Sequence, residues 1–210
     1  MTSQLTVQPF QPRDDPKEES ILGAAKEAFM ELGYAATSMD LVAQRAHASK
    51  TTLYKRFPSK EALFSACIAA ECEARGMNFP VSVFEELPVD QALAEIGSRL
   101  LDLLWSSEAI RMEQIVSGEA ARFPEVAHLY FEAGPNRVCE AMTEYFEAAA
   151  KSGKLAVAKP RFAAEQFVAS LKSLRYAGIV FGHGPKPAKQ ERDAFVVEAV
   201  ALFLDGARPR

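Results

Sequence analysis

The chain has 210 residues, 49% of them hydrophobic, and its 28 acidic side chains outnumber 24 lysines and arginines, so that the net charge is −4. This composition excludes a mostly disordered chain, and no apolar run approaches the roughly 18 residues of a membrane helix, so we expect no bilayer-spanning segment. The N-terminal residues lack an apolar stretch after a basic start, and the three cysteines lack metal-ligand spacing, so we expect no secretory signal and a reducing cytoplasm as the location.

The N-terminal part is expected to contain four helices after a flexible tail, residues 1–15. Apolar residues at helical spacing predict helices at 16–32, 38–46, 50–57 and 60–76. Each helix follows a residue type that favours an N-cap, namely Asp15, Thr37, Ser49 and Ser59. Gly33 is suited to end the first helix, and Pro58 is expected to stop the third.

The rest of the chain is also expected to be helical. The segment from Met77 to Pro88 is predicted to be a connection. Later helices are predicted at 89–104, 108–121, 123–151, 160–181 and 188–206, and the 123–151 helix is expected to be interrupted at Gly134–Pro135. In the 160–181 helix one apolar stripe is predicted from Phe167, Leu171, Leu174, Gly178 and Phe181. Because no segment shows the period-two alternation of strands, the chain is predicted to be all-α, with about nine helices.

One short segment carries a strong positive charge. Residues 41–60 contain five lysines and arginines and no acid, a local charge of +5, so the remaining residues sum to −9. The second and third predicted helices in this part are too short to be stable alone, are joined by roughly three residues and follow a longer helix. That arrangement is typical of a helix-turn-helix, whose second helix enters the DNA major groove. We therefore expect double-stranded DNA as a partner, bound through this segment.

The predicted groove helix, 49–57, presents polar side chains suited to DNA. Lys50, Thr51 and Thr52 lie at its start, where they can reach base edges. Tyr54 and Lys55 suit phosphate contacts, and so does Lys60 at the next helix start. The full set of predicted DNA-binding residues is Thr37, Ser38, Ser49, Lys50, Thr51, Thr52, Tyr54, Lys55 and Lys60.

Residues 21–68 resemble the DNA-binding domain of the TetR family of bacterial transcriptional regulators. The residues that match the family pattern are Ala25, Phe29, Gly33, Tyr34, Thr37, Ser38, Ser49, Lys50, Leu53, Tyr54, Phe57, Ser59, Lys60, Glu61 and Leu63. One position departs from the pattern, since His47 stands where the family usually has glycine. Histidine adopts a positive φ less readily than glycine, so the geometry of this turn is in question.

The resemblance also implies a domain organisation. It places a helix-turn-helix domain at 16–62 and a helical effector-binding and dimerisation domain at 63–210, of which the stretch from Pro160 resembles the AefR-like C-terminal domain. Family dimers usually pair their last two long helices. The last predicted helix is apolar on several sides, with Phe195, Leu202 and Phe203 on one stripe and Val196 and Val200 beside it, so a second surface is needed to cover it. We therefore expect a homodimer that reads a palindromic site.

Aromatic and methionine side chains in the second domain are candidates for an effector pocket. They are Trp105, Met112, Phe131, Met142, Phe146, Phe167 and Tyr176, with Tyr130 beside them. Their helical spacing is equally what core packing requires, so both interpretations stay open. If a pocket is present, its aromatic lining favours an apolar or aromatic small molecule.

The sequence thus predicts a homodimeric, ligand-responsive regulator, a repressor that a small effector releases from DNA. The alternative is a helical small-molecule-binding module with weakened DNA binding, which the departure at His47 would explain. An enzyme is not expected, because no G-x-S-x-G, H-E-x-x-H, C-x-x-C or glycine-rich phosphate loop occurs. No cofactor or metal is expected either, since the three histidines share no ligand spacing.

Overall fold

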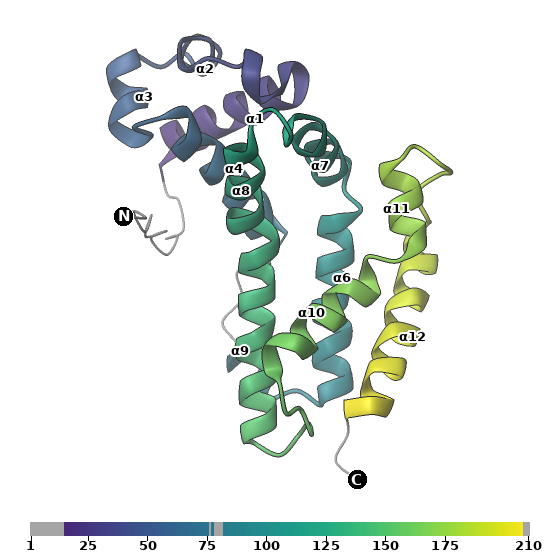
Figure 1. Cartoon of the computed structure of the whole chain (residues 1–210). Coiled ribbons are helices and arrows are strands. Elements are labelled where there is room, and N and C mark those ends of the chain that lie inside the picture. Colours follow the sequence, from purple (N-terminus) through teal and green to yellow (C-terminus); the bar gives the residue numbers. More distant parts are fainter. Residues whose placement is uncertain (1–14, 76, 78–81, 208–210) are drawn as a thin grey trace. The chain divides into compact units, whose positions relative to one another are not determined.

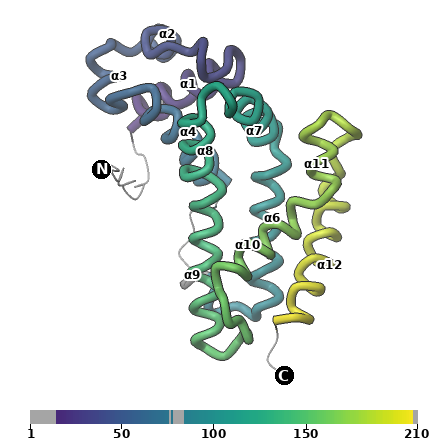
Figure 2. The backbone as a smooth tube through the Cα atoms, in the orientation of Figure 1, coloured from purple at the N-terminus to yellow at the C-terminus, as the bar shows by residue number. Residues whose placement is uncertain are grey.

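The computed structural model describes residues 15–75, 77 and 82–207, and these residues form α-helices, one π-helical segment and connecting turns, without strands (Figures 1 and 2). The all-α prediction is confirmed. The tail predicted at 1–15 lies outside the described residues except for Asp15. The chain divides into two compact units between Ala69 and Ala70, inside one helix, and the division predicted at 62/63 remains a prediction. No helix in the described part of the chain is long and apolar enough to span a bilayer.

Four helices form or enter the first unit. They are α1 (Pro16–Ala36), α2 (Met39–Arg45), α3 (Lys50–Arg56) and α4 (Lys60–Ala74). Gly33 adopts a φ of 81° inside α1 and so breaks its helical geometry where the sequence predicts an end. The N-cap of α2 is Ser38, whose hydroxyl accepts a hydrogen bond from the amide of Leu41 at 3.2 Å. The cap predicted at Thr37 is therefore wrong by one residue, because the Thr37 hydroxyl bonds backward to Gly33 instead.

A small aromatic core holds these helices together. Phe29 of α1 and Phe64 of α4 are fully buried and meet edge to face, with their ring centroids 5.1 Å apart. Tyr34 packs against both rings. Leu53 of α3 is also fully buried, so one side of this short helix is fixed by packing and the opposite side is left to solvent.

The second unit contains the remaining helices. Their bounds are α5 Ser82–Glu85, α6 Val89–Leu104, α7 Ser107–Glu119, α8 Pro124–Phe131, η1 Glu132–Asn136, α9 Arg137–Lys151, α10 Pro160–Leu171, α11 Leu174–Val180 and α12 Lys189–Ala207. Within this unit α10 runs obliquely past α9, α6 and α12 and contacts all three (Figures 1 and 2). Gly97 permits the close approach of α6 and α12, since a Cβ atom there would lie 3.0 Å from Cγ1 of Val196. The core is therefore shared among α6, α9, α10 and α12.

Two predicted boundaries change in the middle of the chain. The connection predicted from Met77 to Pro88 contains the short helix α5. The interruption predicted at Gly134–Pro135 is instead a π-helical turn, η1, through which α8 continues into α9. Proline has no N–H to donate, and a wider π turn accommodates it without ending the helix.

The helix predicted at 160–181 is two helices. Lys172 leaves helical geometry with a ψ of 58°, and Ser173 is extended before α11 begins. The break turns Tyr176 and Ile179 into the core, whereas Leu174 and Phe181 are 90% and 85% exposed. The single stripe predicted from Phe167 to Phe181 is therefore wrong beyond Leu171.

Candidate nucleic-acid interface

Helix α3 presents a polar face opposite a buried one. Its N-cap, Ser49, accepts a hydrogen bond from the amide of Thr52 at 3.0 Å, and the two hydroxyl oxygens lie 2.8 Å apart. The side chains facing solvent are Lys50, Thr51, Tyr54 and Lys55, while Thr52 is half-buried. Apart from Thr52, the predicted base-reading and phosphate-binding residues of α3 thus share one accessible surface.

Most of the positive charge near α3 already has a partner inside the unit. Arg45 pairs with Glu31 at 2.7 Å, Lys50 with Asp40 at 2.6 Å, and Arg56 with Asp15. Lys55 is different, because it makes no hydrogen bond or ion pair with any residue that the structure describes. Lys55 is therefore the basic side chain of α3 that can bind a phosphate without first breaking a contact.

Lys60 is directed into the domain rather than outward. Its ammonium donates to the carbonyl oxygens of Tyr34 and Thr37 at 2.8 and 3.0 Å and lies 4.2 Å from the centre of the Tyr34 ring. The next residue, Glu61, accepts a hydrogen bond from the Tyr34 hydroxyl at 3.0 Å. Its own amide and the Ser59 hydroxyl lower the pKa of Glu61, which keeps the carboxylate charged. Lys60 and Glu61 together hold the connection between α1 and α2, a role that their positions in the sequence do not indicate.

Thr37 and Ser38, predicted to contact the DNA backbone, differ in accessibility. The side chain of Thr37 is only 2% exposed, and its hydroxyl donates to the carbonyl oxygen of Gly33 at 2.8 Å. Ser38 is exposed at the start of α2. Of these two neighbours, Ser38 is the one with a side chain that DNA can reach.

The turn between α2 and α3 has the geometry that a glycine would supply. His47 adopts a φ of 47°, in the left-handed region. The amide of His47 donates to the carbonyl of Gln44 at 3.2 Å, and the amide of Ala48 donates to the carbonyl of Ala43 at 2.9 Å. These two bonds form the Schellman motif, which commonly uses glycine at this position. His47 therefore keeps the turn of the helix-turn-helix intact.

The residues predicted to line an effector pocket separate into groups. Met142, Phe146 and Phe167 are fully buried, and the rings of Phe146 and Phe167 meet edge to face at 6.2 Å, so these three fill the core. Met112 is also buried, whereas Phe131 is half exposed.

Trp105 and Tyr176 are buried groups with polar atoms. Trp105 stacks on Phe195, and its indole nitrogen has no hydrogen-bond partner among the described residues. The Tyr176 hydroxyl donates to Glu113, which also pairs with Lys172 at 3.3 Å. Burial, followed by the bond to Glu113, raises the pKa of Tyr176 far above its usual value, so the phenol stays protonated as a donor.

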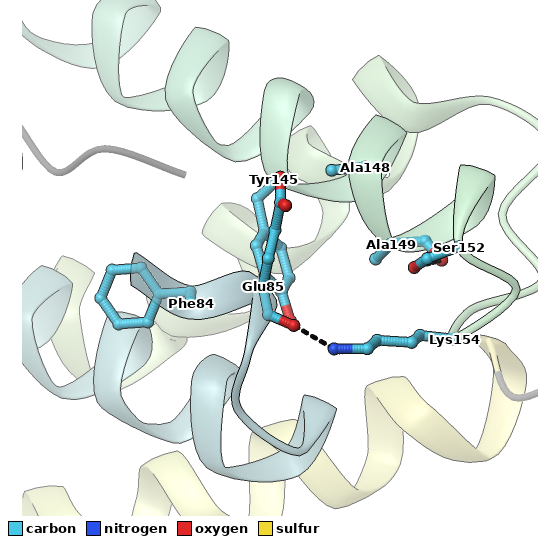
Figure 3. Close-up of a pocket in the computed structure, with 7 residues that line it drawn as sticks. All are labelled: Phe84, Glu85, Tyr145, Ala148, Ala149, Ser152 and Lys154. Carbon is cyan, nitrogen blue, oxygen red and sulfur yellow. Dashed lines mark hydrogen bonds between the residues drawn. The ribbon is translucent and has the colours of Figure 1, made fainter. Parts of the chain in front are cut away.

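A cavity of about 100 Å³ lies elsewhere in this unit (Figure 3). Its lining residues are Phe84, Glu85, Tyr145, Ala148, Ala149, Ser152 and Lys154, and the seven predicted effector residues are not among them. Lys154 crosses its edge and donates to the backbone carbonyl of Glu85 (Figure 3). Burial raises the pKa of Tyr145 to about 12. Within the described residues, no group of three or more histidine, cysteine or acidic side chains is placed to hold a metal ion.

Comparison with known proteins agrees with this architecture. Residues 21–67 match the family model of bacterial regulatory proteins of the tetR family, and residues 91–206, more than half of the chain, match the C-terminal domain of AefR-like transcriptional repressors. The chain belongs to the TetR family of transcriptional regulators. Members of this family are DNA-binding regulators and not enzymes, in agreement with the expected absence of catalysis.

Similar regulators match this chain over nearly its whole length. The solved structure of the flavonoid-responsive regulator FrrA is 32% identical, with a TM-score of 0.72, over 92% of this chain and 98% of that one. A TetR-family regulator from Pseudomonas syringae is 30% identical, with a TM-score of 0.68, over 94% and 100%. The regulator YvkB of Bacillus subtilis is 24% identical over 91% of this chain and 97% of its own length.

Within the TetR-family pattern, the matching residues divide by role. Leu53 and Phe57 are buried and hold α3 in the domain. Tyr34, Thr37, Lys60 and Glu61 bond to one another or to nearby backbone and fix the connection between α1 and α2. Lys50 and Tyr54 lie on the exposed side of α3. Much of this family signature therefore preserves the shape of the domain, and a smaller part faces solvent.

Proposed function

We propose that the chain is a homodimeric repressor that binds a palindromic operator in the cytoplasm and is released by a small apolar or aromatic effector. The observation that carries the DNA-binding proposal is the division of α3 into two faces: Leu53 is fully buried, whereas Lys50, Thr51, Tyr54 and Lys55 face solvent. A helix anchored in this way can lie in the major groove with its polar side toward base edges. The match to AefR-like repressors supports the repressor role.

The proposed DNA contacts follow from accessibility. Lys50, Thr51 and Thr52 contact base edges, because they occupy the first turn of α3. Tyr54 and Lys55 contact phosphates, and Ser38 and Ser49 contact the DNA backbone from the starts of α2 and α3. Thr37 and Lys60 support the site from inside the domain.

The proposed dimer uses α11 and α12. Their solvent side carries large apolar residues, among them Leu174, Phe181, Val197 and Leu202. In a two-fold symmetric dimer, this apolar surface of one subunit packs against the same surface of the other. The pairing fixes the distance and orientation between the two α3 helices. The two half-sites are then expected about 34–36 Å apart, or a multiple of that.

The proposed effector is an apolar or aromatic compound with polar substituents. The buried indole N–H of Trp105, which has no partner in the described part of the chain, and the Tyr176–Glu113 pair supply polar groups in an otherwise apolar unit. The similarity to a flavonoid-responsive regulator supports testing flavonoids first. The effector is expected to bind the conformation that cannot bind DNA more tightly than the conformation that can. The resulting loss of DNA affinity cannot exceed the difference between the effector's affinities for these two conformations.

The decisive experiment is a fluorescence-anisotropy titration with duplexes from the DNA that flanks its gene, in the presence of random competitor. We expect one duplex to bind at least 10³-fold more tightly than random DNA, as specific regulators do. Adding flavonoids should then raise the Kd for that duplex. If no duplex is preferred over competitor at low ionic strength, the proposed function is wrong.

A further inference from the structure

The first turn of α1 contacts the turn that precedes the recognition helix. The ammonium of Lys17 donates to the carbonyl oxygens of Ala46 and His47, at 3.1 and 2.7 Å. Ser20, one turn later, places its hydroxyl 3.4 Å from the same carbonyl of Ala46. Carbonyl groups at the end of a helix lack helical partners and carry partial negative charge, so a lysine is well suited to hold them.

The same turn of α1 also contacts the other end of α3. Asp15 accepts a hydrogen bond from the amide of Lys17 at 2.9 Å, which makes it the N-cap of α1, and its second carboxylate oxygen pairs with Arg56, the last residue of α3. The hydrogen bond from Arg56 lowers the pKa of Asp15, consistent with a charged partner. Lys17 therefore holds the turn before α3, and Asp15, two positions earlier in the chain, holds the last residue of α3.

Recognition helix α3 needs such support because it is short. It has seven residues, and its buried anchors are Leu53 in its second half and Phe57 directly after it. These apolar contacts fix the C-terminal half of the helix, whereas the first turn, which carries the proposed base-reading residues, is held less firmly by packing. Contacts at both ends of the helix restrict its movement, and base readout requires hydrogen-bond geometry accurate to a few tenths of an ångström.

We propose that Asp15 and Lys17 form a two-point clamp that positions α3 for base reading. The clamp lies before residue 21, where the match to the family's DNA-binding domain begins, so the family pattern does not assign it. The inference rests on the proposed DNA binding and adds residues that control its specificity without touching DNA.

The opposing interpretation is that Lys17 binds a DNA phosphate directly, and the dependence of affinity on salt separates the two. Affinity for DNA falls as salt rises, and loss of one phosphate contact makes the plot of log K against log salt less steep by about 0.9. Loss of a positioning contact leaves that slope unchanged and weakens binding to the operator more than binding to random DNA.

The test compares Lys17→Met with Lys17→Arg and with Lys26→Met, which removes the same charge further along α1. Operator and random duplexes are titrated at several salt concentrations, and circular dichroism confirms the folded state. We expect Lys17→Met to lose about tenfold in operator affinity, with little change for random DNA and no change in slope. Lys17→Arg should restore operator binding, and Lys26→Met, which removes a charge from α1 but keeps the bonds from Lys17 to Ala46 and His47, should retain the wild-type ratio of operator to random affinity.

If Lys17→Met does not fold, a second variant tests the same proposal. Asp15→Asn keeps an N-cap acceptor for α1 but removes the charge that holds Arg56, so it should reduce the operator-to-random ratio with the helix intact. Unchanged operator affinity in the folded variants would overturn the clamp, as would an equal loss for both duplexes or a slope reduced by about one. A wild-type chain that prefers no duplex would instead overturn the proposed function itself.

Discussion

The hydroxyl of Thr37 donates a 2.8 Å hydrogen bond to the carbonyl oxygen of Gly33 across the bend at the end of α1. Because Thr37 is buried, Thr37→Val should leave that carbonyl without its partner and lower the stability of the first unit by about 1–2 kcal/mol. Hydrogen exchange of the amides of α1 and α2 measures this loss, and Thr37→Ser, which keeps the hydroxyl, is the control. Normal exchange in Thr37→Val together with an altered salt slope of DNA binding would show that Thr37 contacts DNA instead.

Lys55 and Lys60 carry the same charge but should respond differently to substitution. Lys55→Ala should weaken binding to all duplexes and make the salt dependence less steep by about 0.9, because the ammonium of Lys55 has no partner among the described residues and is available to a phosphate. Lys60→Ala should leave the slope unchanged and lower the melting temperature, since Lys60 bonds to the carbonyls of Tyr34 and Thr37. Salt titrations and thermal melts of both variants decide this, and a reduced slope for Lys60→Ala would contradict the assignment.

His47 should tolerate glycine better than any branched residue. The left-handed conformation costs about 1–2 kcal/mol for a residue with a side chain, whereas glycine adds about 0.5–1 kcal/mol of backbone entropy to the unfolded state. His47→Gly is therefore expected to be neutral or up to about 1 kcal/mol stabilising, and His47→Val destabilising by more than about 1 kcal/mol. Denaturation midpoints of the two variants measure the difference, and the reverse order would contradict the turn geometry.

The cysteines are expected to be unreactive in the folded protein. Cys67, Cys72 and Cys139 are buried thiols, and burial raises the pKa of Cys72 to about 11 and also raises that of Cys139. Because the thiolate is the reactive form, labelling with a thiol reagent at pH 8 should be slow until denaturant is added, after which three thiols react. Rapid labelling of the native protein would show that this packing opens.

Leu202 should be essential for the proposed dimer. Its side chain is 78% exposed on α12, and a charge placed at a two-fold interface faces its own copy. Leu202→Glu should therefore shift the protein toward monomer in sedimentation experiments and weaken operator binding. Phe162→Glu is the matched control, because Phe162 is also exposed, at 57%, but lies on α10. A dimer that survives Leu202→Glu, or one lost in Phe162→Glu, would place the interface elsewhere.

Local signals identified much of the fold correctly. The helix-turn-helix follows from short-range rules, such as Ser49 as the cap of α3 and Gly33 as the break in α1, and these operate within a few residues. The structure corrected predictions where a local pattern allowed more than one outcome. Pro135 was compatible with a break or with a π turn, and the stripe from Phe167 to Phe181 was compatible with one helix or two.

The amino-acid sequence by itself determined the all-α class, the family and the position of the helix-turn-helix, because helix periodicity, capping and motif spacing are encoded between near neighbours. Only the tertiary structure decided which polar side chains are accessible and which are bonded within the protein. Thr37, Lys60 and Lys17 are ordinary polar residues in the sequence, but each bonds to backbone carbonyls that folding brings within reach. Burial and hydrogen-bond partners depend on contacts between helices, and residue spacing along the chain does not contain them.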